Sequence, residues 1–520
     1  MKEEKVHQLL ARLLLVSLSC LVVISCTDLD TPVYDKTADF WLTPKQIEQG
    51  VAQAYVQLRN HAPTWFGGNP NVYDLHEMSA DEIIVPVRGG DWNDATMWEE
   101  LWKHKWTPKS LPVQDGWSFI FNGVDETNLI IESLQITSPA VDNADQLLAE
   151  MKTIRAYYYL QALDLFGNVP IVVKRSVTAA EVDTRSRAEV FDFVENELTQ
   201  SIPALSQEVN GITYGRATQW LAYVLLAKLY LNAEVYTGSA RWDDCIMACD
   251  AILNSGKYAL EEDFFRNFAI DNDNSRENIF VIPFDFNAGL GAFLLQGFTL
   301  HYSSGATFGL QYGGFNGFCS TSEYLGLFDD NDIRKRMFLV GQQYVDQIPD
   351  AAHMQFDSQG NPLIFDPVFT SFHIQPPKTE TAGARCAKWE FNKTGWYMSN
   401  DFAVYRLADV ILMKAEAQFS NGDAGGALVT INQKIDGVSI RSRAGMPDFS
   451  AAEMNPDGLL AERARELSWE GHRRNDMIRL GHFADSRIPE KEQSEDFRKL
   501  FPIPKAELDK NQYLTQNPGY

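Results

Sequence analysis

The chain has 520 residues, of which 45% are hydrophobic, 12% aromatic and 22% charged. This apolar mass supports a large buried core, so the composition excludes intrinsically disordered, collagen-like and coiled-coil chains. Asp and Glu outnumber Lys and Arg by 70 to 45, a net charge of −25 that makes nucleic acid and anionic lipid headgroups poor partners. The length alone allows roughly three domains. No segment after the first thirty residues is apolar over the roughly 20 residues that a membrane-spanning helix needs.

The first 25 residues have the layout of a secretory signal peptide, in which a basic start precedes an apolar run. The run ends in Val23-Ile24-Ser25-Cys26, which resembles a bacterial lipobox, where the cysteine is lipidated and becomes the mature N-terminus. The acidic stretch after Cys26 resembles the surface-export signal of Bacteroidetes lipoproteins. We therefore expect an acyl anchor at Cys26. The alternatives are lipidation at Cys20, which lacks the upstream aliphatic residue, and a cleaved signal with an incidental cysteine.

Hydrophobic periodicity predicts helices in three stretches. Residues 152–165 carry one apolar stripe and end at Gly167, while residues 216–236 are apolar nearly all round, which indicates a helix buried between others. A third stripe covers 401–420, followed by a turn and a second helix from Ala424. Helix, short turn and helix is typical of tetratricopeptide-like hairpins, here with degenerate repeats. The sequence therefore predicts a mainly α fold, a tetratricopeptide-like helical-hairpin scaffold.

Two stretches do not fit the helical pattern. Residues 60–118 hold turns and many tryptophans, and residues 285–320 interleave eight glycines with aromatic residues. Glycine at that frequency is incompatible with a helix interior. Because long loops on a rigid scaffold are the usual place of binding, we expect a loop-rich, partly irregular ligand-binding face.

The sequence offers weak candidates for catalysis and metal binding. Glu462, Glu466 and Glu470 can mimic the carboxylate pair of a glycoside hydrolase, but the arginines at 463, 465, 473 and 474 favour a buried ion-pair network. Cys245 and Cys249 stand four residues apart on an expected helix, and buried free thiols are favoured over a metal site. Asp329-Asp330-Asn331-Asp332 resembles half a calcium loop, and a solvated helix start is favoured. We therefore predict no catalytic constellation, no metal site and no cofactor.

Seven segments in chain order resemble the SusD/RagB family of outer-membrane nutrient-binding lipoproteins. They are Cys26-Thr-Asp-Leu-Asp-Thr-Pro32, Arg155-Ala-Tyr-Tyr-Tyr-Leu160 leading to Phe166-Gly-Asn-Val-Pro170, Gly215-Arg-Ala-Thr218 through Leu231-Asn-Ala233, Arg406-Leu-Ala-Asp-Val-Ile-Leu-Met-Lys-Ala-Glu-Ala417, residues 462–474, Phe501-Pro-Ile-Pro504 and Gln516-Asn-Pro-Gly-Tyr520. One departure is Ile431-Asn-Gln-Lys-Ile-Asp-Gly437, where the family often has Leu-Asn-x-Ile-Arg. That departure leaves the loop geometry after this helix open.

The resemblance implies an organisation and a partner. It implies a lipoprotein signal peptide over residues 1–25 and a single SusD-like unit over 26–520 rather than three domains. Within that unit we expect an N-terminal helical part (26–235) with the loop insertion 60–118, and a C-terminal part (236–520) with Gly/aromatic-rich loops at 285–400. It also implies a SusC-like TonB-dependent transporter, on which the protein sits as a lid, and an outer-membrane, lipid-anchored, cell-surface location.

The candidate ligand-binding residues have the chemistry that sugars need. Glycans present C–H faces that stack on exposed aromatic rings and hydroxyls that pair with planar polar side chains. The segment Arg88-Gly-Gly-Asp-Trp-Asn-Asp94 places Trp92 on a turn among Arg88, Asp91 and Asn93, and it resembles a segment of starch-binding and related SusD-like proteins. The alternative is that Trp92 packs inward. Further loop candidates are Trp65, Tyr302 and Tyr312, whereas Trp98, Trp102 and Trp106 are expected in the core.

The expected function is therefore non-enzymatic capture of oligosaccharides at the cell surface and their delivery to the transporter. Two alternatives from other classes remain. One is a surface polysaccharide hydrolase, and the other is a peptide-binding or scaffold lipoprotein. The glycan itself is not predicted, because ring stacking accepts many sugar faces.

Overall fold

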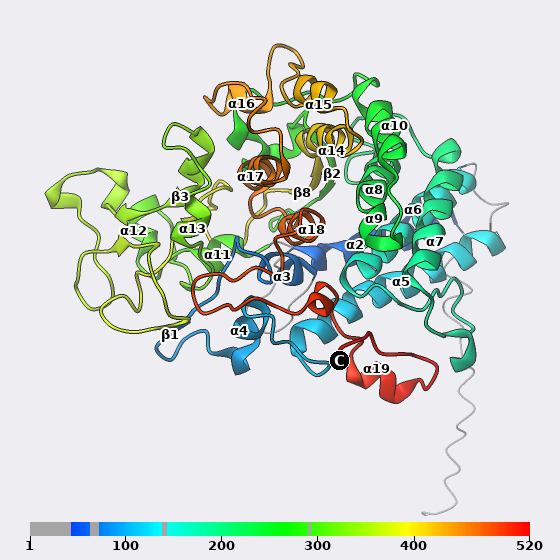
Figure 1. The fold of residues 1–520 in the computed structure, drawn as a ribbon, viewed down its shortest axis with the longest axis horizontal. Helices are drawn as coiled ribbons and strands as arrows, with labels where there is room; N and C mark the ends of the chain where they lie inside the picture. Colours follow the sequence, from blue (N-terminus) through cyan, green and yellow to red (C-terminus); the bar gives the residue numbers. More distant parts are fainter. Residues whose placement is uncertain (1–42, 63–71, 138–142, 290–292) are drawn as a thin grey trace, which may run out of the picture.

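The computed structural model describes residues 43–62, 72–137, 143–289 and 293–520 (Figure 1). The expected signal peptide, Cys20, Cys26 and Trp65 lie outside these residues. The helices of the N-terminal part are α2 (Pro44–Leu58), α3 (Val72–Glu77), α4 (Met97–Trp102), α5 (Leu111–Thr137), α6 (Ala144–Leu165), α7 (Arg187–Ser201), α8 (Gln219–Leu231) and α9 (Ala233–Thr237). Those of the C-terminal part are α10 (Trp242–Leu253), α11 (Leu295–Thr299), α12 (Ser304–Phe308), α13 (Ser322–Leu325), α14 (Leu407–Ser420), α15 (Ala424–Ile431), α16 (Ile440–Arg443), α17 (Pro456–Leu467), α18 (Arg473–Arg479) and α19 (Lys505–Lys510).

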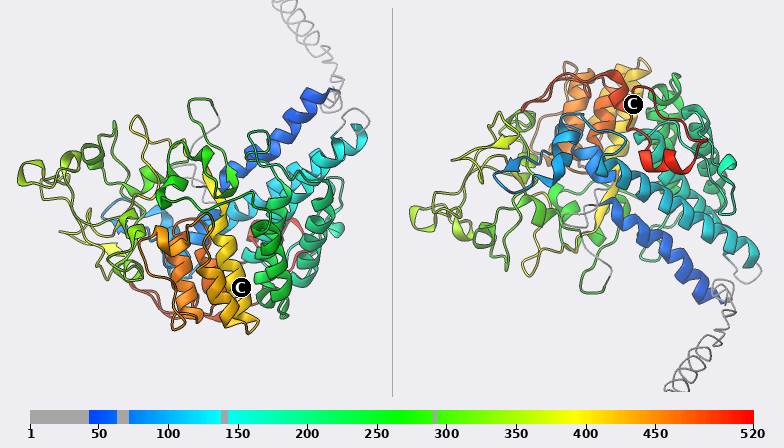
Figure 2. Two further views of the ribbon diagram at one scale, coloured as in Figure 1. Left: turned by 90° about the horizontal axis from the view of Figure 1, so that it is seen from above. Right: turned by 90° about the horizontal axis from the view of Figure 1, so that it is seen from below.

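The long helices pack one against the next in chain order. Helix α5 contacts α6, α6 contacts α7, α7 contacts α8, α8 contacts α10, α10 contacts α14 and α14 contacts α15. Helix α14 also contacts α17, which packs on α18, and α18 reaches α3. The views in Figure 2 show these helices gathered on one side of the molecule and the loops of the 290–400 region on the other. This arrangement confirms the expected helical-hairpin scaffold with a loop-rich end.

The helix predictions hold with one correction. Every residue of α8 except Tyr223 is buried, which explains its lack of a polar face, and α6 ends just before Gly167, whose φ is 73°. The expected helix over 401–420 begins only at Leu407. Its first residues form β8 (Phe402–Arg406) instead, because Phe-Ala-Val-Tyr is rich in the β-branched and aromatic residues that favour strands and pairs with another buried strand.

The described strands form four short pairs. Strand β2 (Asn278–Ile282) runs antiparallel to β8 in the core, and β1 (Val87–Arg88) runs parallel to β6 (His373–Ile374). The other pairs are β3 (Phe338–Leu339) with β7 (Arg385–Cys386), and β4 (Gly341–Gln342) with β5 (Ile364–Phe365), both antiparallel. These pairs tie loops together rather than build a layer.

The loop-rich end differs between its two segments. In the described part of 285–400 no helix is longer than five residues, as the glycine content predicts. The 60–118 stretch, in contrast, contains α3 and α4, so it is not a simple loop insertion. Trp98, Trp102 and Trp106 are 7%, 1% and 0% exposed and lie in the core as expected.

Candidate functional site

Two segments far apart in the sequence meet at the loop-rich end of the molecule, where Figure 1 shows β1 near α11 and α12. The loop after β1 carries Asp91, whose carboxylate accepts a hydrogen bond of 2.5 Å from the Tyr302 hydroxyl. In the same loop the Trp92 indole N–H donates to the Phe315 carbonyl at 2.8 Å. The structure thus brings together three of the predicted site residues, Asp91, Trp92 and Tyr302.

Glycines allow the second segment to fold tightly on itself. A Cβ at Gly313 would lie 1.8 Å from the Tyr302 carbonyl oxygen, and a Cβ at Gly314 would lie 2.0 Å from the Leu300 carbonyl oxygen. No side chain fits at either distance, since the close approach is backbone to backbone. The glycine content of this segment therefore serves chain packing.

Trp92 packs inward, which is the alternative that the sequence left open. Its side chain is 9% exposed, and its ring contacts Phe298 and Phe318 at centroid distances of 6.3 and 5.9 Å. A Cβ at Gly317 would lie 2.3 Å from the indole. The ring fixes the loop in place, and its direct contact with a ligand stays a prediction.

The other residues of this loop divide into buried and exposed ones. Arg88 is 3% exposed, and its guanidinium donates to the carbonyls of Thr379 and Ala382 at 3.2 and 2.8 Å. It therefore joins the loop to the 379–382 segment. Asp91 and Asn93 are exposed. Asp91 reaches solvent although its carboxylate accepts from the Tyr302 hydroxyl.

Exposed aromatic side chains lie on the second segment, with a partner that the sequence analysis missed. Tyr302 is 39% exposed and Tyr312 is 45% exposed. The Tyr312 ring lies 4.9 Å from that of Trp396, whose indole N–H donates to the Gly313 carbonyl at 2.6 Å. The signal for Trp396 is its place in the Asn-Lys-Thr-Gly-Trp-Tyr segment, which has the turn and aromatic composition of the other candidates. We call Tyr312 and Trp396 the aromatic platform.

The polar groups beside the platform act as neutral donors and charged acceptors. Burial and the hydrogen bond to Asp91 raise the pKa of Tyr302 above its ordinary value, so its hydroxyl stays protonated at neutral pH. A phenol, a carboxylate and the Asn93 amide are the planar groups that pair with hydroxyls. The platform and these hydrogen-bonding groups belong to chain segments that contact each other at Gly313 and Tyr302.

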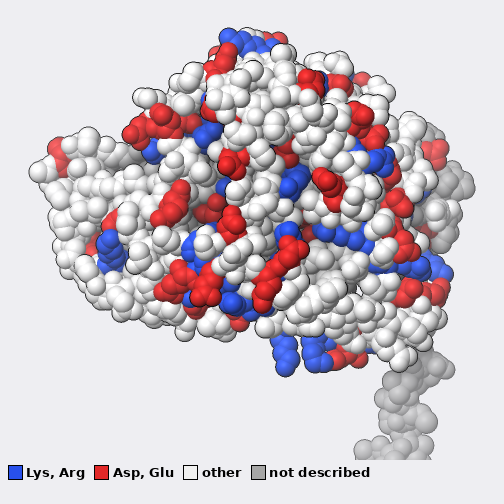
Figure 3. Space-filling model, viewed as in Figure 1, with Lys and Arg blue, Asp and Glu red and all other residues white. Residues whose placement is uncertain are grey.

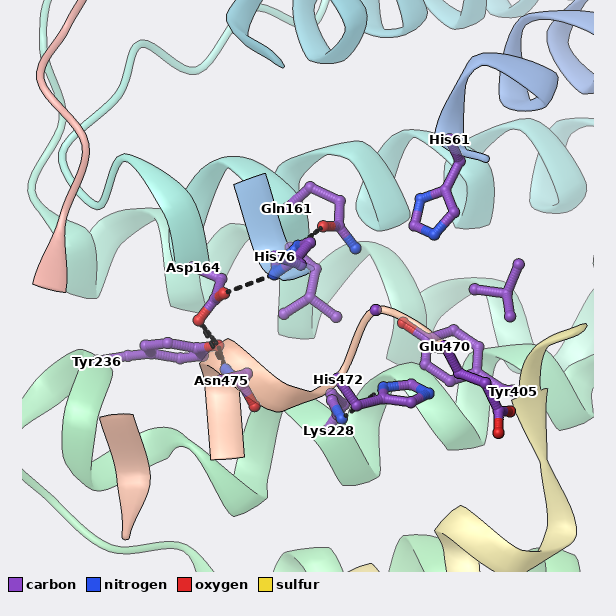
Figure 4. Close-up of a pocket in the computed structure, with 13 residues that line it drawn as sticks. His61, His76, Gln161, Asp164, Lys228, Tyr236, Tyr405, Glu470, His472 and Asn475 are labelled. Carbon is purple, nitrogen blue, oxygen red and sulfur yellow. Dashed lines mark hydrogen bonds and ion pairs between the residues drawn. The ribbon is translucent and has the colours of Figure 1, made fainter. Parts of the chain in front are cut away.

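A second polar cluster lies in the interior, between α3, α6, α8 and the start of α18 (Figure 4). Burial lowers the pKa values of His61 and His472 to about 3 and that of His76 to about 4, so all three imidazoles are neutral at neutral pH. The cavity between them measures about 30 Å³. That is room for about one water molecule, so this cluster is part of the core.

The three glutamates near α17 form the expected buried ion-pair network. Glu462 and Glu466 accept from Arg334 at 2.9 and 3.1 Å, and Glu470 accepts from Arg406 at 2.7 Å. Burial alone would raise the pKa of Glu462, but Arg334 and the neighbouring guanidinium groups lower it. The expected arginine partners need a correction. Of the four arginines that the sequence suggested (463, 465, 473 and 474), only Arg465 binds one of these glutamates, Glu462. Arg463 binds Asp409 and Asp476, Arg473 binds Asp81 and Arg474 binds Asp164.

The remaining candidates for metal chemistry have structural roles. Cys245 and Cys249 are buried free thiols on α10, as expected. Asp332 caps a short 3₁₀-helix by accepting from the Arg334 N–H at 2.9 Å, but it is buried rather than solvated because it also pairs with that guanidinium. Among the described residues no group of three or more His, Cys, Asp or Glu is placed to hold a metal ion. Of the helices in these residues, none has the length and apolarity to cross a membrane.

Two family models match the chain. The model described as "Starch-binding associating with outer membrane" matches residues 67–231, and the one described as "SusD family" matches residues 376–520. Together they cover more than half of the chain. The "Starch-binding protein SusD" of Bacteroides thetaiotaomicron is 23% identical over 100% of both chains. The "SusD-like protein P25" of Formosa agariphila is 22% identical over 86% of this chain and 84% of that protein.

Solved structures share the fold over nearly the whole chain. The surface glycan-binding protein A of Bacteroides thetaiotaomicron in complex with laminarihexaose superposes with a TM-score of 0.72 at 22% identity and covers 91% of this chain and 99% of its own. A laminarin-binding SusD-like protein gives a TM-score of 0.72 at 20% identity, with 92% and 100% covered. With both family models matched in order and this fold along its length, the chain belongs to the SusD/RagB family.

Proposed function

We propose that this chain is a glycan-binding lipoprotein of the outer membrane that captures oligosaccharides and carries out no chemistry on them. The aromatic platform carries this proposal, since Tyr312 is 45% exposed and lies against Trp396, and Gly313 beside it approaches the backbone of Tyr302, whose hydroxyl binds Asp91. Trp396 is half-buried and holds the exposed Tyr312 ring, and an exposed aromatic ring is a surface that a sugar ring stacks on. The charge balance supports the same class, because a neutral sugar feels no repulsion from a chain of net charge −25.

The relatives bind carbohydrates according to their names. One is called a starch-binding protein, and one structural neighbour was solved with laminarihexaose. Starch is an α-linked glucan and laminarihexaose a β-linked one. The two names therefore support a glycan as the ligand class without fixing the linkage.

The location and organisation follow from the family and the N-terminal sequence. We propose that Cys26 carries the lipid, that the mature protein stands on the cell surface, and that residues 26–520 act as one unit. The outer-membrane description of one family model supports the location. The helix contacts that run without a break from α5 through α15 support a single unit.

The proposed partner is a SusC-like TonB-dependent transporter, on which the protein closes as a lid over the sugar. The family resemblance supports this partner. Because the platform lies on irregular loops at one end of a rigid helical scaffold, a captured sugar can be presented to a second protein without unfolding of the scaffold.

Native electrophoresis in gels cast with single polysaccharides tests the proposal. Retardation by one glycan without release of reducing ends is the expected result. Tyr312→Ala and Trp396→Ala should each reduce the retardation. Tyr513→Ala is the matched control, because Tyr513 is also 45% exposed but lies near the C-terminus, and its retardation should equal that of the wild type.

The two alternatives predict different results in the same assay. Release of reducing ends would support the hydrolase, against which stands the use of Glu462, Glu466 and Glu470 in ion pairs with Arg334 and Arg406. No retardation by any glycan, with retained folding, would refute sugar binding and leave the peptide-binding or scaffold function.

A further inference from the structure

A hollow lies beside β2 and β8, and neither Tyr312 nor the loop after β1 lines it. Its volume is about 500 Å³, within the usual range of small-molecule sites. The lining comes from two segments, 270–287 and 392–401. Its polar side chains are Asp273, Asp285, Asn287, Asn392, Ser399 and Asp401. The lining thus offers carboxylates, amides and a hydroxyl, and no basic residue.

The inner wall of this hollow is held rigidly. Asp401 accepts from the backbone N–H of Phe284 at 2.9 Å and from the hydroxyl of Tyr214. The Asn272 amide donates to the Asp401 carbonyl at 2.8 Å and its oxygen accepts from the Asp401 N–H at 2.8 Å. On the second segment, the Asn392 amide donates to the Tyr397 carbonyl at 2.6 Å. Asp401 and Asn392 are therefore held in place by contacts within the protein.

An aromatic pair stands next to this wall with one face open. Phe286 is 49% exposed and stacks on Tyr397, with ring centroids 4.6 Å apart and planes 10° apart. Phe286 lies between two lining residues, and its backbone N–H donates to the hydroxyl of the lining residue Ser399 at 3.3 Å. Leaving a phenylalanine half exposed costs hydrophobic free energy, and the core gains nothing from it. A ring stacked flat on a second ring and open to solvent is a surface for a further flat, apolar face.

The hollow is connected with the aromatic platform through the chain. Trp396 belongs to the platform and the next residue, Tyr397, belongs to this pair. The two aromatic pairs are therefore carried by neighbouring residues of one segment.

We propose that this hollow and the aromatic pair at its border form a second saccharide subsite, in which Phe286 on Tyr397 stacks a sugar ring and Asp285, Asn287 and Asn392 bind hydroxyls. The proposal rests on the proposed glycan-binding function and adds a ligand class. Carboxylates accept hydrogen bonds from hydroxyls but repel other carboxylates and sulfates, so the subsite takes neutral sugar units and rejects uronates and sulfated sugars.

Titration calorimetry with neutral hexasaccharides of glucose, xylose and mannose tests the stacking surface. With the hexasaccharide that the wild type binds most tightly, Phe286→Ala should weaken binding about fivefold or more. The matched control is Tyr513→Ala, because the aromatic side chain of Tyr513 is 45% exposed near the C-terminus, and the affinity of this variant should equal that of the wild type. Equal affinities for both variants and the wild type would overturn the subsite.

Hexagalacturonate tests the charge selection. The wild type should bind it at least tenfold more weakly than the neutral hexasaccharide. Asp285→Asn should narrow that ratio because it removes a negative charge from the subsite. The variant keeps the local structure, since Asn retains the oxygen that accepts from the Ala288 N–H at 3.0 Å. Hexagalacturonate bound by the wild type as tightly as the neutral sugar, with loss of that binding in Phe286→Ala, would overturn the ligand class.

The two proposals fail in different ways. A wild type that binds none of these sugars and is retarded by no polysaccharide in the affinity gels refutes glycan binding and the subsite with it. A wild type that binds, loses affinity in Trp396→Ala and keeps it in Phe286→Ala and Asp285→Asn retains the proposed function and loses only the second subsite.

Discussion

Replacement of Gly313 by alanine should displace the aromatic platform from within its own loop. The added Cβ would lie 1.8 Å from the carbonyl oxygen of Tyr302, and distances under 3.0 Å are essentially never found for a real Cβ. The two atoms must therefore separate by about 1 Å or more, and neither can rotate away, because the Cβ is fixed to the backbone and the oxygen is part of it. The Gly313 carbonyl also accepts from the Trp396 indole at 2.6 Å, so the movement reaches the platform.

The size of the effect follows from these contacts. Overpacking of a well-packed site costs about 1–3 kcal/mol, and a clash between two backbone atoms belongs at the upper end. Loss of the hydrogen bonds from Trp396 to Gly313 and from Tyr302 to Asp91 adds about 0.5–1.5 kcal/mol for each bond. We expect a fall of about 4–6 kcal/mol in the free energy of unfolding of this segment and at least a fivefold loss of glycan affinity.

Urea unfolding followed by tryptophan fluorescence, together with the affinity gel, measures both effects. Gly90→Ala is the control within the same site, because a Cβ at Gly90 meets no atom within 4 Å. Its urea midpoint should stay within experimental error of the wild type or rise slightly. If Gly313→Ala unfolds and binds like Gly90→Ala, the glycines do not set the platform and the reasoning is wrong.

Three further predictions concern the scaffold and the anchor. Arg406→Met should lower the free energy of unfolding by about 3–5 kcal/mol because it leaves buried carboxylates without their partner, whereas Arg276→Met, in an exposed pair, should cost about 1 kcal/mol or less in the same urea titration. Cys26→Ala should move the full-length protein from the membrane fraction into the soluble fraction, and unchanged membrane association would contradict lipidation at this residue. Burial lowers the pKa of His61 to about 3 from an unfolded value near 6.5, so its contribution is fully present above pH 6.5 and is lost as pH falls towards 3. His61→Gln, which keeps an acceptor for the Tyr157 hydroxyl, should therefore reduce the pH dependence of stability between pH 6.5 and 4.5 by up to about 1.4 kcal/mol per pH unit, and an unchanged slope would refute the assignment.

The helical scaffold was readable from the sequence because its signals are local. A stripe of apolar residues, a stretch such as 219–231 with no polar face and a glycine after the last turn each report a helix without knowledge of its neighbours. The sequence pattern places the start of α14 too early, because an apolar stretch such as Phe402–Arg406 is compatible with a helix as well as with a strand. Its strand conformation depends on pairing with Asn278–Ile282, more than one hundred residues away, which no local pattern contains.

The site was harder to predict because composition does not tell which way a ring points. Trp92 has the turn, the glycines and the polar neighbours of an exposed ring, yet Phe298, Phe315 and Phe318 surround it. Those contacts come from a segment two hundred residues later. The exposure of Tyr312 is predictable for a physical reason, since its hydroxyl gains from contact with solvent, and its side chain is 45% exposed. The role of Trp396 is not predictable from composition, because it depends on contact with Tyr312.

The buried ion pairs bear on the choice of ligand. Guanidinium groups of Arg334, Arg406 and Arg443 are fully buried, and each is bound by buried carboxylates such as Glu277 and Glu466. Because an unpaired charge in the core is too costly to keep, these interior charges nearly balance. The excess of Asp and Glu over Lys and Arg must therefore fall mainly on the surface, where acidic and basic groups are seen interspersed (Figure 3). Arginines used inside the scaffold are not available to bind an anionic glycan outside it. The excess of negative charge on the surface would repel a polyanionic ligand. A neutral sugar therefore fits both the hollow beside β8 and the rest of the molecule.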